Sequence, residues 1–331
     1  MPKYKKNEAK EWVKQYLTGD VPTMITCFKE DGEVDYEAMR HNFRHVLKFG
    51  ADGYAVNAFA GEQDSLTKEE KKKILELAIE EGQRNKVPVM TSVVGNLSEV
   101  MERIKHAEEI GADAVWLGGP PGAGLSEEGT YQWYKYIADR VNIGLAIFNT
   151  ARPFPVGPRN AARLAAECPN IVSLKTCPPA ICWEVMQALK EFKTEMTLFM
   201  PFHSAFSCVL SGIIPPDLAS YANDSRYMFN TETDHPAKEC WELAKKGELK
   251  KAAELYYSEP LASRIEYFNQ KFRRDNTPSH SSGVVDIPLF KYWHELMGFR
   301  GGPCRLPLLP PTAEEKRKLK ADMIRLRYIE K

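Results

Sequence analysis

The sequence lacks an excess of either charge and lacks any long hydrophobic run. Forty-five Lys and Arg residues balance forty-five Asp and Glu residues in a chain of 331. Without a basic excess, the chain is not expected to bind nucleic acid or an anionic membrane surface. No apolar stretch reaches the roughly 18 residues of a membrane-spanning helix. The N-terminal segment MPKYKKNEAKEWVKQYL lacks the apolar centre of a signal peptide, so we expect a cytoplasmic protein in which this segment packs as a helix.

Cysteine and histidine are too scattered to indicate disulfide or metal chemistry. The seven cysteines are odd in number and no two have C-x-x-C spacing, which argues against a disulfide framework and a zinc cage. Only His41 and His45 have helical spacing, without a nearby acidic ligand. The GGPPGAG run from Gly118 lacks the Lys-Ser/Thr of a phosphate-binding loop and the dinucleotide fingerprint. We therefore expect no metal and no organic cofactor.

Eight short runs of apolar and β-branched residues alternate with helical patterns, as buried parallel strands do. Eight βα units predict an α/β fold of the (β/α)8 TIM-barrel type. A doubly wound sheet is the alternative, disfavoured because no G-x-G-x-x-G follows the first run. We assign residues 1–229 to the barrel with its N-terminal helical segment, and residues 230–331 to a helical extension packed on it. The runs begin at Val21, Ala51, Val87, Ala112, Ile143, Ile171, Thr197 and Asp217.

Helix boundaries follow from caps. Thr67 and Glu70 have the spacing of a capping box and open a helix that we expect to end at Gly82. Gly50 and Gly111 are expected to close the helices before them. In the C-terminal part, breaker-rich segments such as GGPCRLPLLPPT predict loops.

In such a barrel the active site lies at the carboxyl ends of the strands. Among the strand-end side chains, Lys175 is the only cation. An amine held among apolar residues loses hydration for its charged form, so its pKa falls and the neutral amine can attack a carbonyl. The alternative is a lysine exposed to solvent or ion-paired at a strand edge. Position alone does not decide between them.

Three motifs occur in order along the chain: AFAGEQDSLTKEEK from Ala58, IFNTARP from Ile147 and SLKT from Ser173. They resemble the G-T-T-G-E…L-T-x-E-E, Y-N-x-P and lysine-strand motifs of the dihydrodipicolinate synthase and N-acetylneuraminate lyase superfamily of class I (Schiff-base) aldolases. The resemblance covers about residues 20 to 310. It implies a TIM barrel, Lys175 as the imine-forming residue, a pyruvate-type 2-oxo acid as substrate and a homotetramer. The substrate-binding residues expected on this basis are Phe59, Ala60, Gly61, Glu62, Asn149, Thr150, Arg152, Thr176 and His203.

The departures from the family pattern concern hydroxyl groups. The family tyrosine that relays protons falls on Phe148, which has no hydroxyl. The two threonines of G-T-T-G-E fall on Phe59 and Ala60. Another group must then move the proton: His203, Tyr54, Glu62 or a water held by Asn149 and Thr176. The carboxylate of a keto acid would meet other donors, with the N–H groups around Gly61 and the guanidinium of Arg152 as candidates.

A segment near the C-terminus indicates a more specific reaction. GGPCRLPLLPP resembles the G-P-C-R-P-P segment of the hydratase-aldolase branch, which handles benzylidenepyruvates, although a structural loop explains it equally. Phe59 and Phe148, extended by Trp116, Trp133 and Phe154, favour a bulky or aromatic substrate. We therefore expect a Schiff-base lyase or aldolase that acts on a pyruvate-type 2-oxo acid, with a hydratase-aldolase as its more specific form. A dihydrodipicolinate synthase-like condensing or dehydrating enzyme and a non-catalytic small-molecule binder are the alternatives.

Overall fold

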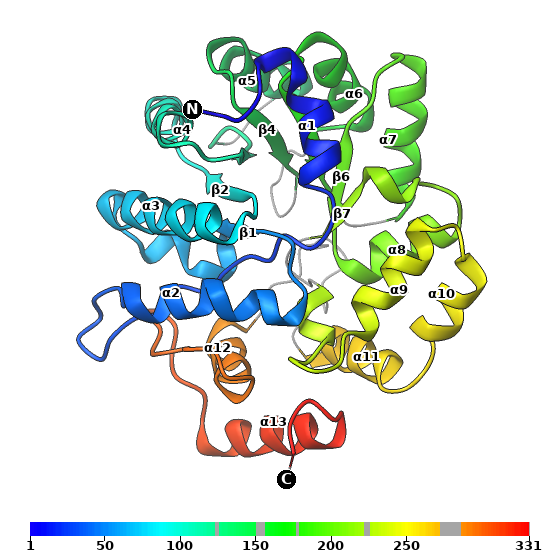
Figure 1. Ribbon diagram of the computed structural model, residues 1–331. Helices are drawn as coiled ribbons and strands as arrows, with labels where there is room; N and C mark the ends of the chain where they lie inside the picture. Colours follow the sequence, from blue (N-terminus) through cyan, green and yellow to red (C-terminus); the bar gives the residue numbers. More distant parts are fainter. Residues whose placement is uncertain (123–125, 150–155, 177–178, 222–225, 272–285, 331) are drawn as a thin grey trace.

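The computed structural model describes residues 1–122, 126–149, 156–176, 179–221, 226–271 and 286–330. Its centre is one curved sheet of seven strands, in which each strand pairs in parallel with the next along the chain (Figure 1). This confirms seven of the eight predicted strands. They are β1 (Tyr54–Val56), β2 (Val89–Val93), β3 (Ala114–Gly118), β4 (Gly144–Phe148), β5 (Ile171–Lys175), β6 (Thr197–Met200) and β7 (Ala219–Tyr221).

The predicted first strand, VPTMITCF, does not form a strand in the structure. Its backbone nevertheless lies between β7 and β1: the N–H of Val21 donates to the carbonyl of Tyr221 (3.1 Å), and that of Met24 to Ala55 (2.8 Å). Pro22 has no N–H to donate, so a continuous ladder cannot form here. This segment joins the two edge strands of the sheet through isolated bridges instead.

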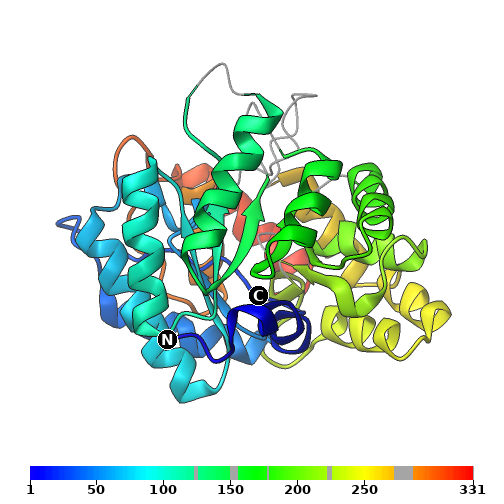
Figure 2. The same cartoon turned by 90° about the horizontal axis from the view of Figure 1, so that it is seen from above.

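Helix α2 precedes β1, and six further helices connect the successive strands. In the described part of the chain these seven helices cover the outer face of the sheet (Figures 1 and 2). The predicted capping box is present, since the N–H of Glu70 donates to Thr67 Oγ1 and the N–H of Thr67 to Glu70 Oε2. Gly111 ends its helix in the left-handed region, as predicted, with φ 90°. The helices are α2 (Tyr36–His45), α3 (Lys68–Asn85), α4 (Leu97–Ile110), α5 (Glu127–Arg140), α6 (Pro158–Glu167), α7 (Pro179–Glu191) and α8 (Phe202–Leu210).

The predicted end of α3 at Gly82 is wrong. The helix continues to Asn85 and ends with Lys86 at φ 58°. Gly82 serves packing instead, because a Cβ there would lie 2.3 Å from Val89 Cγ2 of β2. The glycine lets the helix approach the sheet closely.

The N-terminal segment forms helix α1 (Ala9–Tyr16), as predicted, at one end of the ring of strands (Figure 2). Ala9 and Val13 are buried in a cluster with residues on the inner side of the sheet, including Met90 and Trp116. The helix therefore closes the amino-terminal end of the strands, opposite the end where the predicted site lies.

The C-terminal part is mainly helical, as predicted. Residues 297–312, which contain the GGPCRLPLLPPT run, form neither helix nor strand. We keep residue 230 as the proposed start of the extension. None of the helices in the described part of the chain is long and apolar enough to cross a membrane. The C-terminal helices are α9 (Pro236–Lys245), α10 (Leu249–Tyr256), α11 (Leu261–Lys271), α12 (Ile287–Leu296) and α13 (Ala313–Arg325).

Candidate active site

Lys175 is the last residue of β5, paired in register with Phe148 of β4 and Phe199 of β6. Only 1% of the residue is exposed. Its Nζ lies over two aromatic rings, 4.4 Å from the centroid of Trp116 and 4.7 Å from that of Phe148. The lysine is therefore buried beside aromatic rings, and the solvent-exposed alternative is wrong.

The layer beneath Lys175 is aromatic. Trp116 packs edge-to-face against Phe199 at 5.6 Å and lies 6.3 Å from Phe148. Its side chain is completely buried, and in the part of the chain that the structure describes its indole Nε1 has no hydrogen-bond partner. Buried amine chemistry here would take place in an environment with little water, where electrostatic interactions are stronger than in solvent.

The segment expected to hold a keto-acid carboxylate, Phe59–Gly61, is a short 3₁₀ turn after β1. The N–H of Gly61 donates to Ala58 (3.0 Å) and that of Glu62 donates to Phe59 (3.0 Å), so these two donors are engaged within the turn. Gly61 in turn accepts a hydrogen bond from Thr26 Oγ1 (2.6 Å). The expectation that the N–H of Gly61 binds substrate is therefore not supported by this geometry.

Two side chains of the same turn differ in exposure. Phe59 is 40% exposed, so its ring lies largely at the surface rather than in an enclosed pocket. Ala60 is buried and offers only backbone groups. Phe59 also borders a groove of about 290 Å³, whose other wall contains Leu306 and Leu308.

Glu62 is committed to a buried ion pair. Its Oε1 lies 2.5 Å from Nζ of Lys291 in α12, and the two side chains are 1% and 2% exposed. Its Oε2 accepts from the N–H of Arg305 (3.1 Å). Glu62 was expected to be a possible acid or base. Its contacts instead join the C-terminal part of the chain to the turn after β1.

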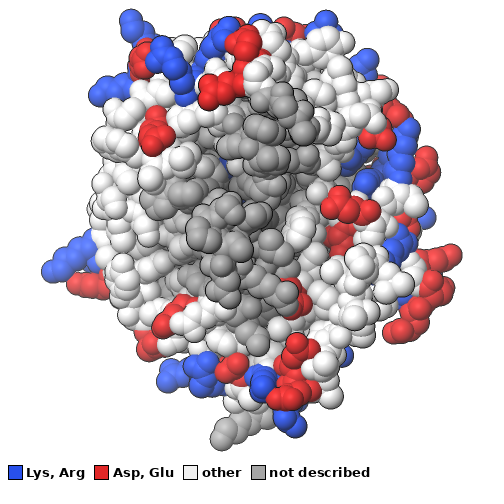
Figure 3. Space-filling view, turned by 180° about the vertical axis from the view of Figure 1, so that it is seen from behind, with Lys and Arg blue, Asp and Glu red and all other residues white. Residues whose placement is uncertain are grey.

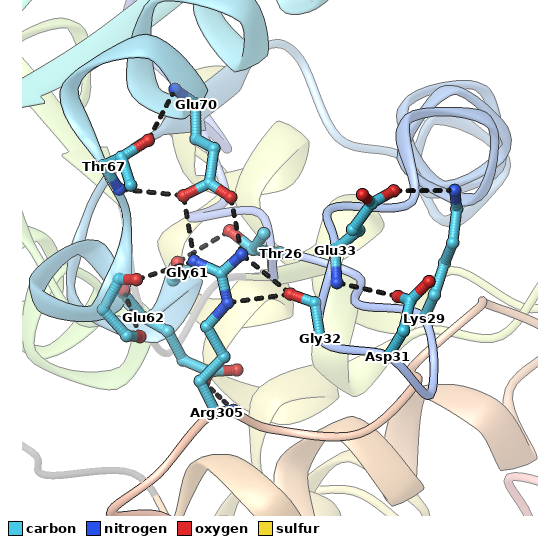
Figure 4. Close-up of polar contacts among 11 residues, drawn as sticks. Thr26, Lys29, Asp31, Gly32, Glu33, Gly61, Glu62, Thr67, Glu70 and Arg305 are labelled. Carbon is cyan, nitrogen blue, oxygen red and sulfur yellow. Dashed lines mark hydrogen bonds and ion pairs between the residues drawn. The ribbon is translucent and has the colours of Figure 1, made fainter.

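Arg305, the arginine of the GGPCR run, is a clamp (Figure 4). Its guanidinium donates to the carbonyls of Gly32 (2.9 and 2.7 Å) and Ser65 (2.7 Å) and bidentately to Glu70 (2.9 and 2.5 Å). These hydrogen bonds lower the pKa of Glu70 to about 2. This pattern fits the structural explanation of the run, which therefore carries less weight as evidence for the hydratase-aldolase branch.

The other described candidates follow the carboxyl ends of β4, β5 and β6. His203, in the first turn of α8 after β6, is half-buried and its Nε2 lies 3.2 Å from Ser204 Oγ. Asn149 is bonded to Val156, since its Nδ2 donates to Val156 O (3.0 Å) and its Oδ1 accepts from Val156 N (2.6 Å). Thr176 is buried directly after Lys175, and its N–H donates to Phe199 O (2.8 Å). Thr150 and Arg152, with Phe154, lie outside the described residues.

Tyr54 does not belong to the site. Its hydroxyl accepts from Asn85 of α3 (3.3 Å) and its ring packs on Phe43 of α2, so it faces the outer helices. Burial raises its pKa. Trp133 also lies on the helical layer, in α5, where its Nε1 donates to Gly118 O (3.2 Å).

Sequence reasoning missed Lys291 and the role of Arg305, and gave Trp116 only a place in an aromatic wall. Lys291 occupies a buried position in a helix whose neighbours Leu289, Phe290 and Trp293 are also buried, and a lysine in such an apolar pattern was the available signal. Arg305 and Lys291 contact residues far earlier in the chain, and sequence spacing gives no indication of such pairs. Among the described residues, no three His, Cys, Asp or Glu side chains form a possible metal site.

The surface carries no single-sign field on the face seen in Figure 3. Lys and Arg side chains alternate with Asp and Glu around its rim, and the described residues nearer the centre are mostly uncharged. Interspersed charge of this kind does not form the continuous basic patch that a polyanion needs, among the described residues of this face.

Comparison with known proteins shows which family this chain matches. Residues 16–211 match the model of the dihydrodipicolinate synthetase family. The 4-hydroxy-tetrahydrodipicolinate synthase of Chlorobaculum parvum is 25% identical over 317 residues, which cover 95% of this chain and 98% of that protein. The crystal structure of dihydrodipicolinate synthase from Thermotoga maritima superimposes with a TM-score of 0.77 at 22% identity, covering 95% of this chain and all of that one.

A second solved structure has a ligand in its description. YagE, a prophage protein of the dihydrodipicolinic acid synthase family from E. coli K12, was solved in complex with pyruvate. It superimposes with a TM-score of 0.76 at 23% identity, covering 94% of this chain and 99% of that one. At these identities the two structures show a shared fold.

Proposed function

The chain belongs to the dihydrodipicolinate synthetase family, and from this premise we propose that it is a lyase in which Lys175 forms a Schiff base with a pyruvate-type 2-oxo acid. The observation that carries the proposal is the position of Lys175: a buried amine at the carboxyl end of a central strand, with its Nζ over the rings of Trp116 and Phe148. The pyruvate complex of a family member with the same fold supports the choice of substrate class.

The chemistry follows from the amine. The neutral Nζ of Lys175 attacks the keto carbon, and the resulting carbinolamine takes up one proton from a neighbouring acid and loses water to give a protonated imine. When the bond to the β-substituent breaks, its electron pair flows into the imine and an enamine forms. Addition of the enamine to an aldehyde is the reverse reaction, and loss or gain of water can use the same enamine. The protonated imine is the electron sink, so this reaction uses only residues of the chain.

The substrate is proposed to be bulky or aromatic. Trp116 and Phe148 present ring faces beside Nζ, and such surfaces stabilise apolar or planar groups by burial and stacking. A hydratase-aldolase acting on benzylidenepyruvate-like adducts fits this site. A dihydrodipicolinate synthase-like condensing enzyme is the second candidate, favoured by the names of the relatives. The absence of hydroxyls at Phe148, Phe59 and Ala60 favours the first.

Proton transfer is assigned to His203. Tyr54 faces the outer helices and Glu62 is committed to Lys291, whereas His203 is half-buried in the first turn of α8, which follows β6, the neighbour of the strand that carries Lys175. Imidazole is the side chain whose ordinary pKa suits acid and base roles near neutral pH. A homotetramer remains an expectation from the family resemblance, and a non-catalytic binder is the outcome that the following experiment would reveal.

Borohydride trapping tests the proposal. The protein is incubated with pyruvate, and separately with a benzylidenepyruvate, then reduced, digested and examined by mass spectrometry. We expect a reduced adduct on the peptide that carries Lys175, and none in Lys175→Arg. Fragment spectra must exclude Lys291, the other buried lysine with an aromatic neighbour. The more reactive acid indicates the branch, and folded wild-type protein that forms no adduct with either acid overturns the lyase assignment.

A further inference from the structure

Trp116 is a buried hydrogen-bond donor without an acceptor. Its side chain is 0% exposed, and its indole Nε1 has no hydrogen-bond partner among the described residues. Buried indole N–H groups usually find an acceptor, because leaving a desolvated donor unpaired is energetically costly. An unpaired donor at the centre of a fold therefore calls for an explanation, such as a ligand that completes it.

The position of Trp116 supplies that explanation. The Nζ of Lys175 lies over its ring, 4.4 Å from the centroid. In an imine of a 2-oxo acid, the carboxylate is attached directly to the imine carbon. Its oxygens are then only three bonds from Nζ, close to the ring over which Nζ lies.

The groups that the family resemblance assigns to the carboxylate are absent. Phe59 and Ala60 replace two threonines, and the N–H of Gly61 is engaged with Ala58. A ligand carboxylate on Lys175 cannot use these donors, and Arg152, the other candidate, lies outside the described residues. An indole N–H can donate but cannot accept or relay a proton, so it suits holding a carboxylate and not proton transfer.

We propose that the indole N–H of Trp116 donates a hydrogen bond to the carboxylate of the 2-oxo acid bound at Lys175. Trp116 is then a substrate-binding residue that selects keto acids over simple ketones. This role rests on the proposed Schiff-base function. A hydrogen bond to an ionised oxygen in a site with little water is stronger than one between neutral groups. In the free protein the same donor is unsatisfied, so Trp116 stabilises the complex at some expense to the empty fold.

The test removes only the donor. Site-specific replacement of Trp116 by 3-benzothienylalanine exchanges the indole N–H for sulfur and keeps the fused ring beside Lys175. Borohydride trapping is then measured against concentration for pyruvate and for 2-butanone, which has an ethyl group where pyruvate has its carboxylate. We expect the half-saturating pyruvate concentration to rise about 10- to 100-fold. The response to 2-butanone should change less than about threefold, within the spread of mutational effects on packing alone.

The chain offers a matched control. Trp241 is also completely buried with an unpaired Nε1, but it packs on Tyr221 and Phe206 rather than on Lys175. The same replacement there should leave pyruvate trapping unchanged. Trp116→Phe provides a second variant made of natural residues, and it should show the same selective loss for pyruvate. Without ligand, the benzothienyl protein should be at least as stable to urea as the wild type, since it no longer buries an unpaired donor.

Each possible result either supports or contradicts the proposed role of Trp116. If the wild type traps pyruvate and the benzothienyl protein traps it equally well, the role of Trp116 is wrong while the Schiff-base function stands. An equal loss for pyruvate and 2-butanone would assign Trp116 to packing and also overturn the carboxylate contact. If the wild type traps neither compound, the proposed function fails and this inference falls with it.

Discussion

Nζ of Lys291, in the C-terminal helix α12, lies 2.5 Å from Oε1 of Glu62, which follows β1 at the predicted site, and both side chains are buried. Glu62 has a positive φ of 52°, a conformation that costs a non-glycine residue of the order of 1 kcal/mol or more. The ion pair and the N–H of Arg305 favour this conformation. The C-terminal part thus helps to determine the shape of the turn at Phe59–Gly61.

Breaking this pair from one side should destabilise the protein strongly. Lys291→Met leaves a buried carboxylate without its counter-ion, and we expect a loss of about 3–5 kcal/mol in the free energy of unfolding. The double variant Lys291→Met/Glu62→Leu removes both charges, so its loss should be clearly smaller. Urea unfolding of the wild type, both single variants and the double variant measures the coupling.

An exposed pair serves as the reference. Lys318 and Glu314 are bonded on the surface of α13 with 63% and 61% of their side chains exposed, so Lys318→Met should have little effect. A double variant as unstable as Lys291→Met alone would contradict the buried-pair argument, because it would place the loss in packing rather than in uncompensated charge.

The Arg305–Glu70 clamp predicts a pH-dependent stability. The hydrogen bonds from Arg305 lower the pKa of Glu70 to about 2, below the ordinary value of about 4.5. The stabilisation is therefore fully present above pH 4.5 and is lost as pH falls towards 2. Glu70→Gln should cost on the order of 2 kcal/mol at pH 7, and the two proteins should converge as the pH approaches 2. A constant difference from pH 7 to pH 3 in urea titrations would show that the carboxylate charge is irrelevant.

Much of the fold was predictable from local pattern. Buried parallel strands are continuous apolar runs, and seven of them stand where such runs occur. The first apolar run, VPTMITCF, does not form a strand because Pro22 has no N–H to donate to a ladder. The end of α3 was misjudged because Gly82 serves contact with Val89, and a glycine required for packing cannot be told from a terminating one by sequence.

The site was only partly predictable, for geometric reasons. Lys175 could be found because a cation at the end of an apolar strand is unusual. Tyr54 was misplaced because both faces of these strands are apolar, so alternation does not reveal which side chains point inward. The unpaired donor of Trp116 follows from the full arrangement around it, and the Glu62–Lys291 pair joins residues from opposite parts of the chain. Neither has a signature in local spacing.

His294 in α12 predicts a second pH effect. Burial lowers its pKa to about 4; its Nδ1–H donates to Phe290 O (2.8 Å) and its Nε2 accepts from the hydroxyl of Tyr227 (2.9 Å). Between pH 6.5 and 4 the unfolded chain binds the proton and the folded one does not, so stability falls as the pH falls. This residue should account for up to about 3 kcal/mol between pH 7 and 4. His294→Gln should flatten the urea-derived stability profile in that window, and an unaltered slope would contradict the neutral, buried state.

Restoring the missing hydroxyl tests what the divergence at Phe148 did to the chemistry. Phe148 is partly exposed and lies 4.7 Å from Nζ of Lys175, so a tyrosine hydroxyl has space to act as an acid or base near the imine. We expect Phe148→Tyr to accelerate the exchange of pyruvate methyl protons for deuterium, a measure of enamine formation followed by NMR, at least about 10-fold. In a Lys175→Arg background the same substitution should be silent, which separates imine chemistry from general base catalysis in solution. A decrease in exchange would instead place the Phe148 ring in direct contact with the present substrate, where a polar atom at its tip is unfavourable.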